Sequence, residues 1–216
     1  MKIKVITLFP EMFKNVLMQS IIKRAQDNNK VNIDVCDLRQ WTSDKHKTVD
    51  DSPYGGGAGM ILKPDIIDRA LSELKQTANG QEKIILLTPQ GKRFTQKIAS
   101  EFSQYTSLIF ICGHYGGFDE RIRRLVDFEI SLGDFVLTGG EIPAMAMIDA
   151  TIRLLPGVIN SESLKNETHS QPKYKQFPQY TRPEIFNAKS KKLPPLSVPG
   201  ELLSGNHAKI KSWRKI

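Results

Sequence analysis

The chain has 216 residues, of which 39% are hydrophobic and 25% are charged, and this is the composition of a globular protein with one good core. No apolar run approaches the roughly 20 residues of a membrane-spanning helix. The start, MKIKVITLFPEMF, is typical of a first strand and not of a signal peptide. The net charge of +8 modestly favours a polyanionic partner.

Strand-like and helical segments alternate along the first three quarters of the chain. Apolar runs typical of strands lie at 3–9, 31–36, 84–88, 107–112 and 128–132. Helical periodicity predicts helices at 10–22, 65–76, 94–103, 119–126 and 141–154. The first begins at Pro10, and its apolar face comprises Met12, Phe13, Val16, Leu17, Ile21 and Ile22. This order predicts an α/β fold with a mostly parallel sheet and helices on both faces.

The positive charge lies in the last quarter of the chain. Residues 160–216 hold 11 Lys and Arg against 4 Asp and Glu, whereas residues 1–159 hold 20 against 19. The segment after residue 159 is polar and rich in proline, with little periodicity. We therefore expect an α/β domain over 1–159, a flexible linker over 160–200 and a short basic segment over 201–216. Its cations are Lys209, Lys211, Arg214 and Lys215.

Only two cysteines occur, and each lies inside an apolar run. Cys36 and Cys112 are predicted to be buried free thiols, which fits a reducing cytoplasm. No C-x-x-C pair or His/Cys cluster indicates a zinc site.

Three glycine-bearing loops follow predicted strands. They are LLTPQG, which ends at Gly91, FICGHYGGFDE at 110–120 and SLGDFVLTGGE at 131–141. Ligands of an open α/β sheet bind outside the carboxyl ends of its strands, so we expect these loops to converge on one ligand. None carries a lysine aimed at a phosphate, which favours a ligand without phosphates.

A fourth glycine-rich stretch, DDSPYGGGAGM at 50–60, matches no phosphate-binding motif. Met60 and Ile61 stand where a P-loop needs lysine and a hydroxyl, and Leu62 stands where a dinucleotide fingerprint needs its last glycine. Taken alone, the stretch is interpreted as a flexible surface loop.

Eight motifs in this order carry a family resemblance: LFPEMF, DDSPYGGGAGM, TPQG, CGHYGGFDERI, LGDFVLTGGE, RLLPGV, QYTRPE and LLSGNHAKIKSWR. They resemble the bacterial-type tRNA (guanine-N1-)-methyltransferases of the SPOUT superfamily, which act at guanosine 37, beside the anticodon. The resemblance runs from residue 1 to about 214. It implies a SPOUT fold with a C-terminal trefoil knot, a homodimer with shared active sites, and tRNA as partner. It also implies S-adenosyl-L-methionine as methyl donor, and it suggests Mg²⁺ as an assisting ion without implying any metal ligand.

The resemblance also implies roles for particular residues. Methylation of guanine N1 needs a base for the N1 proton and a cation or donor near O6, and Arg153 is implied to stabilise that oxygen. Without the resemblance, Arg153 is equally a cation at a helix C-terminus. The implied cofactor pocket comprises Leu87, Thr88, Pro89, Gly113, Tyr115, Gly117, Leu132, Gly133, Leu137, Gly139, Gly140 and Pro143. The implied contacts to the target nucleotide are His46, Asp50, Tyr54, Gly55, Gly57 and Gly59.

Three positions depart from the family pattern. The place of the usual general-base aspartate falls on Thr168, and Glu167, the nearest carboxylate, is the candidate base. Gly116 stands where the family often has a glutamate that meets the amino end of the cofactor. Either cofactor affinity is expected to be weaker, or Asp119 or Glu120 compensates for the missing carboxylate. The chain ends at Ile216, so the tRNA-binding C-terminal segment is expected to be truncated.

Three functions are compatible with these observations. The first is an active tRNA (guanine-N1-)-methyltransferase. The second is a degenerate relative that binds S-adenosylmethionine or RNA with little turnover, because the aspartate is missing. The third is an RNA-binding module without chemistry, against which the three cofactor-type loops argue.

Overall fold

The computed structural model describes residues 1–75, 81–171 and 174–214, and the chain forms two compact units, Met1–Leu164 and Lys165–Ile216. Lys215, one of the predicted basic residues, lies outside the described residues. Within the described part of the chain, no helix is long and apolar enough to cross a bilayer.

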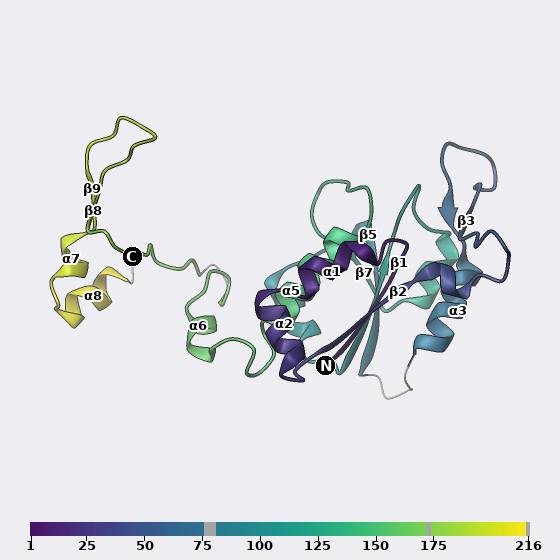
Figure 1. Ribbon diagram of the computed structural model, residues 1–216, viewed down its shortest axis with the longest axis horizontal. Coiled ribbons are helices and arrows are strands. Elements are labelled where there is room, and N and C mark those ends of the chain that lie inside the picture. The colour runs from purple at the N-terminus through teal and green to yellow at the C-terminus, as the bar shows by residue number, and fades with distance from the viewer. Residues whose placement is uncertain (76–80, 172–173, 215–216) are drawn as a thin grey trace. The chain divides into compact units, whose positions relative to one another are not determined.

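The first unit is built on a five-stranded sheet (Figure 1). Its order is β2-β1-β6-β5-β7, and every neighbouring pair is parallel, which confirms the predicted parallel α/β sheet. The strands are β1 (Lys2–Thr7), β2 (Asn32–Asp37), β5 (Glu82–Arg93), β6 (Ser107–Cys112) and β7 (Phe128–Ser131). A separate antiparallel pair, β3 (Asp50–Asp51) with β4 (Ile61–Leu62), frames the glycine-rich stretch.

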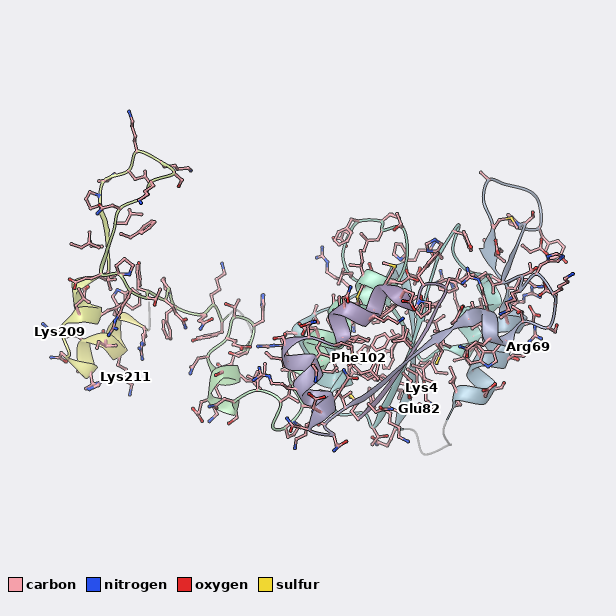
Figure 2. All side chains as sticks on the ribbon, viewed as in Figure 1. Lys4, Arg69, Glu82, Phe102, Lys209 and Lys211 are labelled. Atoms are coloured by element: carbon pink, nitrogen blue, oxygen red, sulfur yellow. The ribbon has the colours of Figure 1, made fainter. Side chains whose placement is uncertain are left out.

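Helices cover both faces of the sheet, as predicted. One face carries α1 (Glu11–Leu17), α2 (Ser20–Asp27), α4 (Gln96–Phe102) and α5 (Glu141–Ile152). The other carries α3 (Pro64–Leu74) and two 3₁₀ helices, η1 (Leu38–Trp41) and η2 (Glu120–Leu125). The central strand β6 is fully buried, and its consecutive residues Phe110 and Ile111 enter different hydrophobic clusters on opposite faces of the sheet. Phe102, labelled in Figure 2, is fully buried in the cluster of Phe110.

Three details of the predicted elements are wrong. The helix expected over 10–22 is two helices, α1 and α2, and Met12 and Val16 of its expected apolar face are 44% and 43% exposed. The helix expected over 119–126 is the 3₁₀ helix η2. Cys36 is only half-buried, whereas Cys112 is buried as expected.

Strand β5 also extends past its expected end at residue 88. Leu87 and Lys92 both pair with Ile130 of β7, so residues 88–91 bulge out of the strand, and pairing then resumes. The TPQG motif is therefore an interruption within one strand and not a loop that ends it.

The second unit contains short elements. Helix α6 (Ser161–Lys165) lies at the boundary between the units, and β8 (Ile185–Phe186) pairs with β9 (Leu196–Ser197). Helices α7 (Gly200–Leu203) and α8 (His207–Trp213) follow, and the Asn206 side chain caps α8 by accepting from two backbone N–H groups. Trp213 packs against Tyr180 with ring centroids 6.0 Å apart. Lys209 and Lys211 are exposed on α8 (Figure 2).

Candidate active site

A cavity opens in the first unit beside the bulge of β5 and the loops that follow β6 and β7. All three predicted glycine-bearing loops contribute to its lining, as we expected of loops at the carboxyl ends of parallel strands. The lining includes eleven of the twelve residues implied by the resemblance: Leu87, Thr88, Pro89, Gly113, Tyr115, Gly117, Leu132, Leu137, Gly139, Gly140 and Pro143. Gly133 is the exception.

Glycines let the main chain of these loops pack closely. A Cβ atom on Gly140 would lie 2.7 Å from the Cα atom of Cys112, and one on Gly113 would lie 2.7 Å from the Phe118 ring. A Cβ atom on Gly139 would lie 2.3 Å from Glu141 Oε2. Distances this short are not found for real Cβ atoms. The loops therefore form the present wall of the cavity, which we call the cavity wall, only with glycine at these positions.

A buried polar cluster lies behind this wall. The Thr7 hydroxyl donates to Glu141 Oε1 at 2.7 Å, and both residues are buried. Burial, and to a smaller extent the Glu141 carboxylate, holds the pKa of the Cys112 thiol well above its usual value. His114 packs between Phe9 and Tyr115, with ring centroids 4.7 and 4.9 Å away. Its buried Nδ1 has no hydrogen-bond partner among the described residues.

Sequence reasoning missed several residues of the lining. They are His114, Gly116, Phe118, Ile130, Ser131, Phe135, Val136 and Thr138. All belong to the same loops or strand ends as the predicted residues, so their proximity along the chain was the available signal.

The glycine-rich stretch forms the turn between β3 and β4, which we call the glycine hairpin (residues 50–62). Tyr54 is completely exposed at this turn. Gly55, Gly56, Gly57 and Gly59 have positive φ angles of 84°, 79°, 134° and 90°. Asp50 starts the hairpin in β3 and is half-buried. These residues lie outside the cavity lining.

Backbone hydrogen bonds connect the glycine hairpin to the cavity. Gly116 N–H donates to Met60 O at 2.8 Å, Leu62 N–H donates to Gly117 O at 2.9 Å, and Asp119 N–H donates to Leu62 O at 3.1 Å. A Cβ atom on Gly116 would lie 2.9 Å from Met60 O. The glycine at position 116 therefore allows the hairpin to lie directly against the cavity loop.

The remaining candidates near the hairpin are His46, Asp119 and Glu120. His46 lies in an exposed turn, where its N–H and the N–H and hydroxyl groups of Thr48 donate to Asp44. The hydrogen bond from the Thr48 side chain is the largest of the effects that lower the pKa of Asp44. Asp119 accepts two hydrogen bonds from the Arg121 guanidinium, at 2.8 and 2.7 Å, and these lower its pKa. Neither Asp119 nor Glu120 belongs to the cavity lining.

The two candidate catalytic residues belong to different units. Arg153 is half-buried at the C-terminal cap of α5, outside the cavity lining. Glu167 is half-buried in the second unit, and its carbonyl accepts from Ser170 N–H at 2.9 Å. The Thr168 hydroxyl accepts from Gln176 N–H at 3.1 Å. Among the described residues, no group of three His, Cys, Asp or Glu side chains is placed to hold a metal ion.

A parallel sheet with a glycine-walled cavity at the carboxyl ends of its strands defines an α/β ligand-binding protein. Comparison with known proteins defines it further. The model of the family "tRNA (Guanine-1)-methyltransferase TrmD" matches residues 1–216. Two proteins named tRNA (guanine-N(1)-)-methyltransferase, from Bacillus velezensis and Bacillus subtilis, are each 51% identical to this chain over 215 residues. The matched region covers 99% of this chain and 86% of the length of each relative.

The protein of the same name from Staphylococcus epidermidis is 49% identical over 215 residues, with 84% of its length covered. The chain belongs to the tRNA (guanine-1)-methyltransferase TrmD family. The resemblance of its eight ordered motifs is confirmed.

Proposed function

We propose that the protein transfers a methyl group from S-adenosyl-L-methionine to N1 of guanosine 37 in tRNA, beside the anticodon. The observation that carries this proposal is the convergence of three loops on one cavity in a chain of this methyltransferase family. The relatives, about half identical over nearly the whole chain, carry the name of this activity. No observation favours the alternative of a degenerate relative.

The cavity fits the methyl donor. Leu87, Leu132 and Leu137 provide apolar surface for an adenine ring, and glycines on two of the loops bring main-chain N–H and C=O groups within reach of its polar edge. The twelve residues implied by the resemblance would hold the donor, with Gly133 supporting the lining through its neighbour Leu132. When bound, S-adenosylmethionine supplies an electrophilic methyl group on its sulfonium sulfur.

The protein's own residues would then activate and place the guanine. As the resemblance implies, Arg153 would donate to O6, where negative charge develops, and Glu167 is the candidate base for the N1 proton. The glycine hairpin, with His46, Asp50, Tyr54, Gly55, Gly57 and Gly59, surrounds a nucleotide taken out of its stack. The exposure of Tyr54 supports this role, since an aromatic ring free of the core is available to stack on a base.

The proposal extends to the assembly. Large apolar side chains in the cavity lining, on α1 and its C-cap, and at the start of α5 are exposed: Met12, Val16, Met18, Phe135, Val136, Leu137 and Ile142. They support a homodimer with shared active sites, which would bury them. The proposal includes the trefoil-knotted course of the chain that the family resemblance implies.

The proposal also covers the second unit and Mg²⁺. The basic residues of the second unit, including Lys209, Lys211 and Arg214, would bind tRNA phosphates. The contribution of this unit to tRNA affinity should therefore weaken as the salt concentration rises. A need for Mg²⁺ is measured by running the assay with and without a chelator.

The test is a methyl-transfer assay with radiolabelled S-adenosylmethionine and two tRNA transcripts. One transcript has guanosines at positions 36 and 37, and the other has position 36 changed. Label in the first transcript alone supports the proposed function. No label in either, with enzyme that binds S-adenosylhomocysteine, contradicts it.

Variants then assign the catalytic roles. Arg153→Ala should lower turnover by roughly 10²–10³-fold, as loss of an oxyanion donor does, while cofactor affinity changes little. Glu167→Ala should abolish activity, and Thr168→Asp should raise it. Equal losses of cofactor binding and turnover in Arg153→Ala would refute its role at O6.

A further inference from the structure

Arg123 on η2 joins three segments of the first unit through one guanidinium group. Its Nε donates to Glu120 Oε2 at 2.9 Å. Its two terminal nitrogens donate to Glu129 Oε2 on β7 and to Gln90 Oε1 in the TPQG bulge. The Arg123 side chain is only 25% exposed, so the group is held in place and partly shielded from water.

The bulge that Arg123 contacts forms part of the cavity wall. Residues 88–91 leave the ladder between β5 and β7, and Thr88 and Pro89 line the cavity. At the far end of the bulge, a Cβ atom on Gly91 would lie 2.5 Å from the backbone of Glu129. Gly91 thus packs directly on β7, and the Arg123 guanidinium fixes the neighbouring Gln90 to the side chain of the same Glu129.

We propose that Arg123 is a positioning residue that fixes the TPQG bulge and thereby raises affinity for the adenosyl ligand. This inference rests on the proposed function of the cavity. A bulge outside the strand ladder loses conformational freedom when a ligand binds against it, and a bulge already fixed by Arg123 loses less. Arginine suits this task because its planar guanidinium offers five donors in fixed directions, whereas a lysine ammonium does not.

The experiment measures the dissociation constant of S-adenosylhomocysteine by calorimetry. The variants are Arg123→Met, Gln90→Ala and the double variant, with Arg124→Met as control. Arg124 is the exposed neighbour on the same η2 helix, so its replacement makes the same charge change without touching the cluster. We expect about 5- to 10-fold weaker binding for Arg123→Met, about 3-fold for Gln90→Ala, and less than twofold for the control.

Two comparisons separate positioning from a general effect of charge or folding. If Arg123 acts through Gln90, the double variant binds about as weakly as Arg123→Met alone, because the two effects are not additive. Arg123→Lys keeps the positive charge but loses the planar guanidinium and its donors in fixed directions. It should therefore bind S-adenosylhomocysteine nearly as weakly as Arg123→Met. Gln90→Ala changes an exposed side chain and keeps the test available if an Arg123 variant fails to fold.

The inference is overturned if Arg123→Met binds as tightly as Arg124→Met, if Arg123→Lys restores full affinity, or if the double variant shows fully additive losses. A failure of the wild-type protein to bind S-adenosylhomocysteine would instead overturn the proposed function.

Discussion

The cavity wall and the glycine hairpin are both rich in glycine, but for different physical reasons. In the wall, Gly113, Gly139 and Gly140 have no space for a Cβ atom, because neighbouring atoms lie 2.3–2.8 Å from its position. In the hairpin, Gly55 and Gly56 have open space around them but positive φ angles of 84° and 79°. The wall therefore needs glycine for close packing, whereas the hairpin needs it for its backbone conformation.

The largest expected effect comes from adding one methyl group to the wall. In Gly140→Ala, the new Cβ atom would lie 2.7 Å from Cys112 Cα and 2.8 Å from Gly113 N, and backbone atoms cannot move away cheaply. Overpacking of this kind costs about 1–3 kcal/mol of unfolding free energy. We expect that loss in urea denaturation and at least a roughly tenfold loss of S-adenosylhomocysteine affinity. An unchanged affinity would show that the loops can separate without harm to the cavity.

A smaller effect is expected when the same methyl group is added to the hairpin. In Gly56→Ala, the new Cβ atom would have no atom within 4 Å, but the alanine must keep the positive φ angle. This conformation costs about 1–2 kcal/mol of unfolding free energy. Cofactor affinity should stay within about twofold, while KM for tRNA rises. Gly200→Ala is the matched control, since Gly200 has neither a close neighbour nor a positive φ. If Gly56→Ala weakens cofactor binding as much as Gly140→Ala does, the distinction between the two regions is wrong.

The smallest expected effect concerns pH and the thiol behind the wall. Burial keeps the pKa of Cys112 above the value of about 8.5 that it has in the unfolded chain. The contribution of the Cys112 thiol to stability is therefore complete below about pH 8.5. It is lost as the pH rises above that value, because the unfolded chain then releases the thiol proton that the folded chain keeps. Measured between pH 7 and 10, the unfolding free energy of the wild type should fall relative to that of Cys112→Ala. A constant difference would contradict this.

The two thiols offer a control within the same chain. Burial, and then the neighbouring Asp34, raise the pKa of Cys36 as well, but that residue is only half-buried. A thiol reagent at pH 8 should therefore modify Cys36 before Cys112, and Cys112 should react only when the protein unfolds.

Hydrophobic periodicity was sufficient to predict the strands of the sheet, because apolar runs marked all five. The three glycine-bearing stretches near the carboxyl ends of those strands predicted the position of the cavity. The exposure of Met12 and Val16 could not be predicted, because an apolar side chain on a helix has the same sequence pattern in a core and at a surface. The extension of β5 through TPQG was also missed, because proline and glycine normally signal the end of a strand.

Contacts between distant segments were beyond sequence reasoning. The fit of Gly116 against Met60 and the contact of Arg123 with Gln90 both join residues more than 30 positions apart. A motif read along the chain shows that glycine is present at position 116 but not what fills the space at its Cβ position. The family resemblance supplied Arg153 and Glu167 as catalytic residues, and these assignments stay predictions.

Hydrogen exchange with and without S-adenosylhomocysteine tests the central claim most directly. That claim is that the TPQG bulge of β5 and the loops after β6 and β7 form the cofactor site. The account predicts slower exchange in peptides covering residues 87–92, 113–118 and 131–140. It also predicts slower exchange at 60–62, where the hairpin is hydrogen-bonded to the cavity loop, and little change over 44–56 and 177–214. Protection confined to the hairpin turn or to the second unit, with these three loops unchanged, would contradict it.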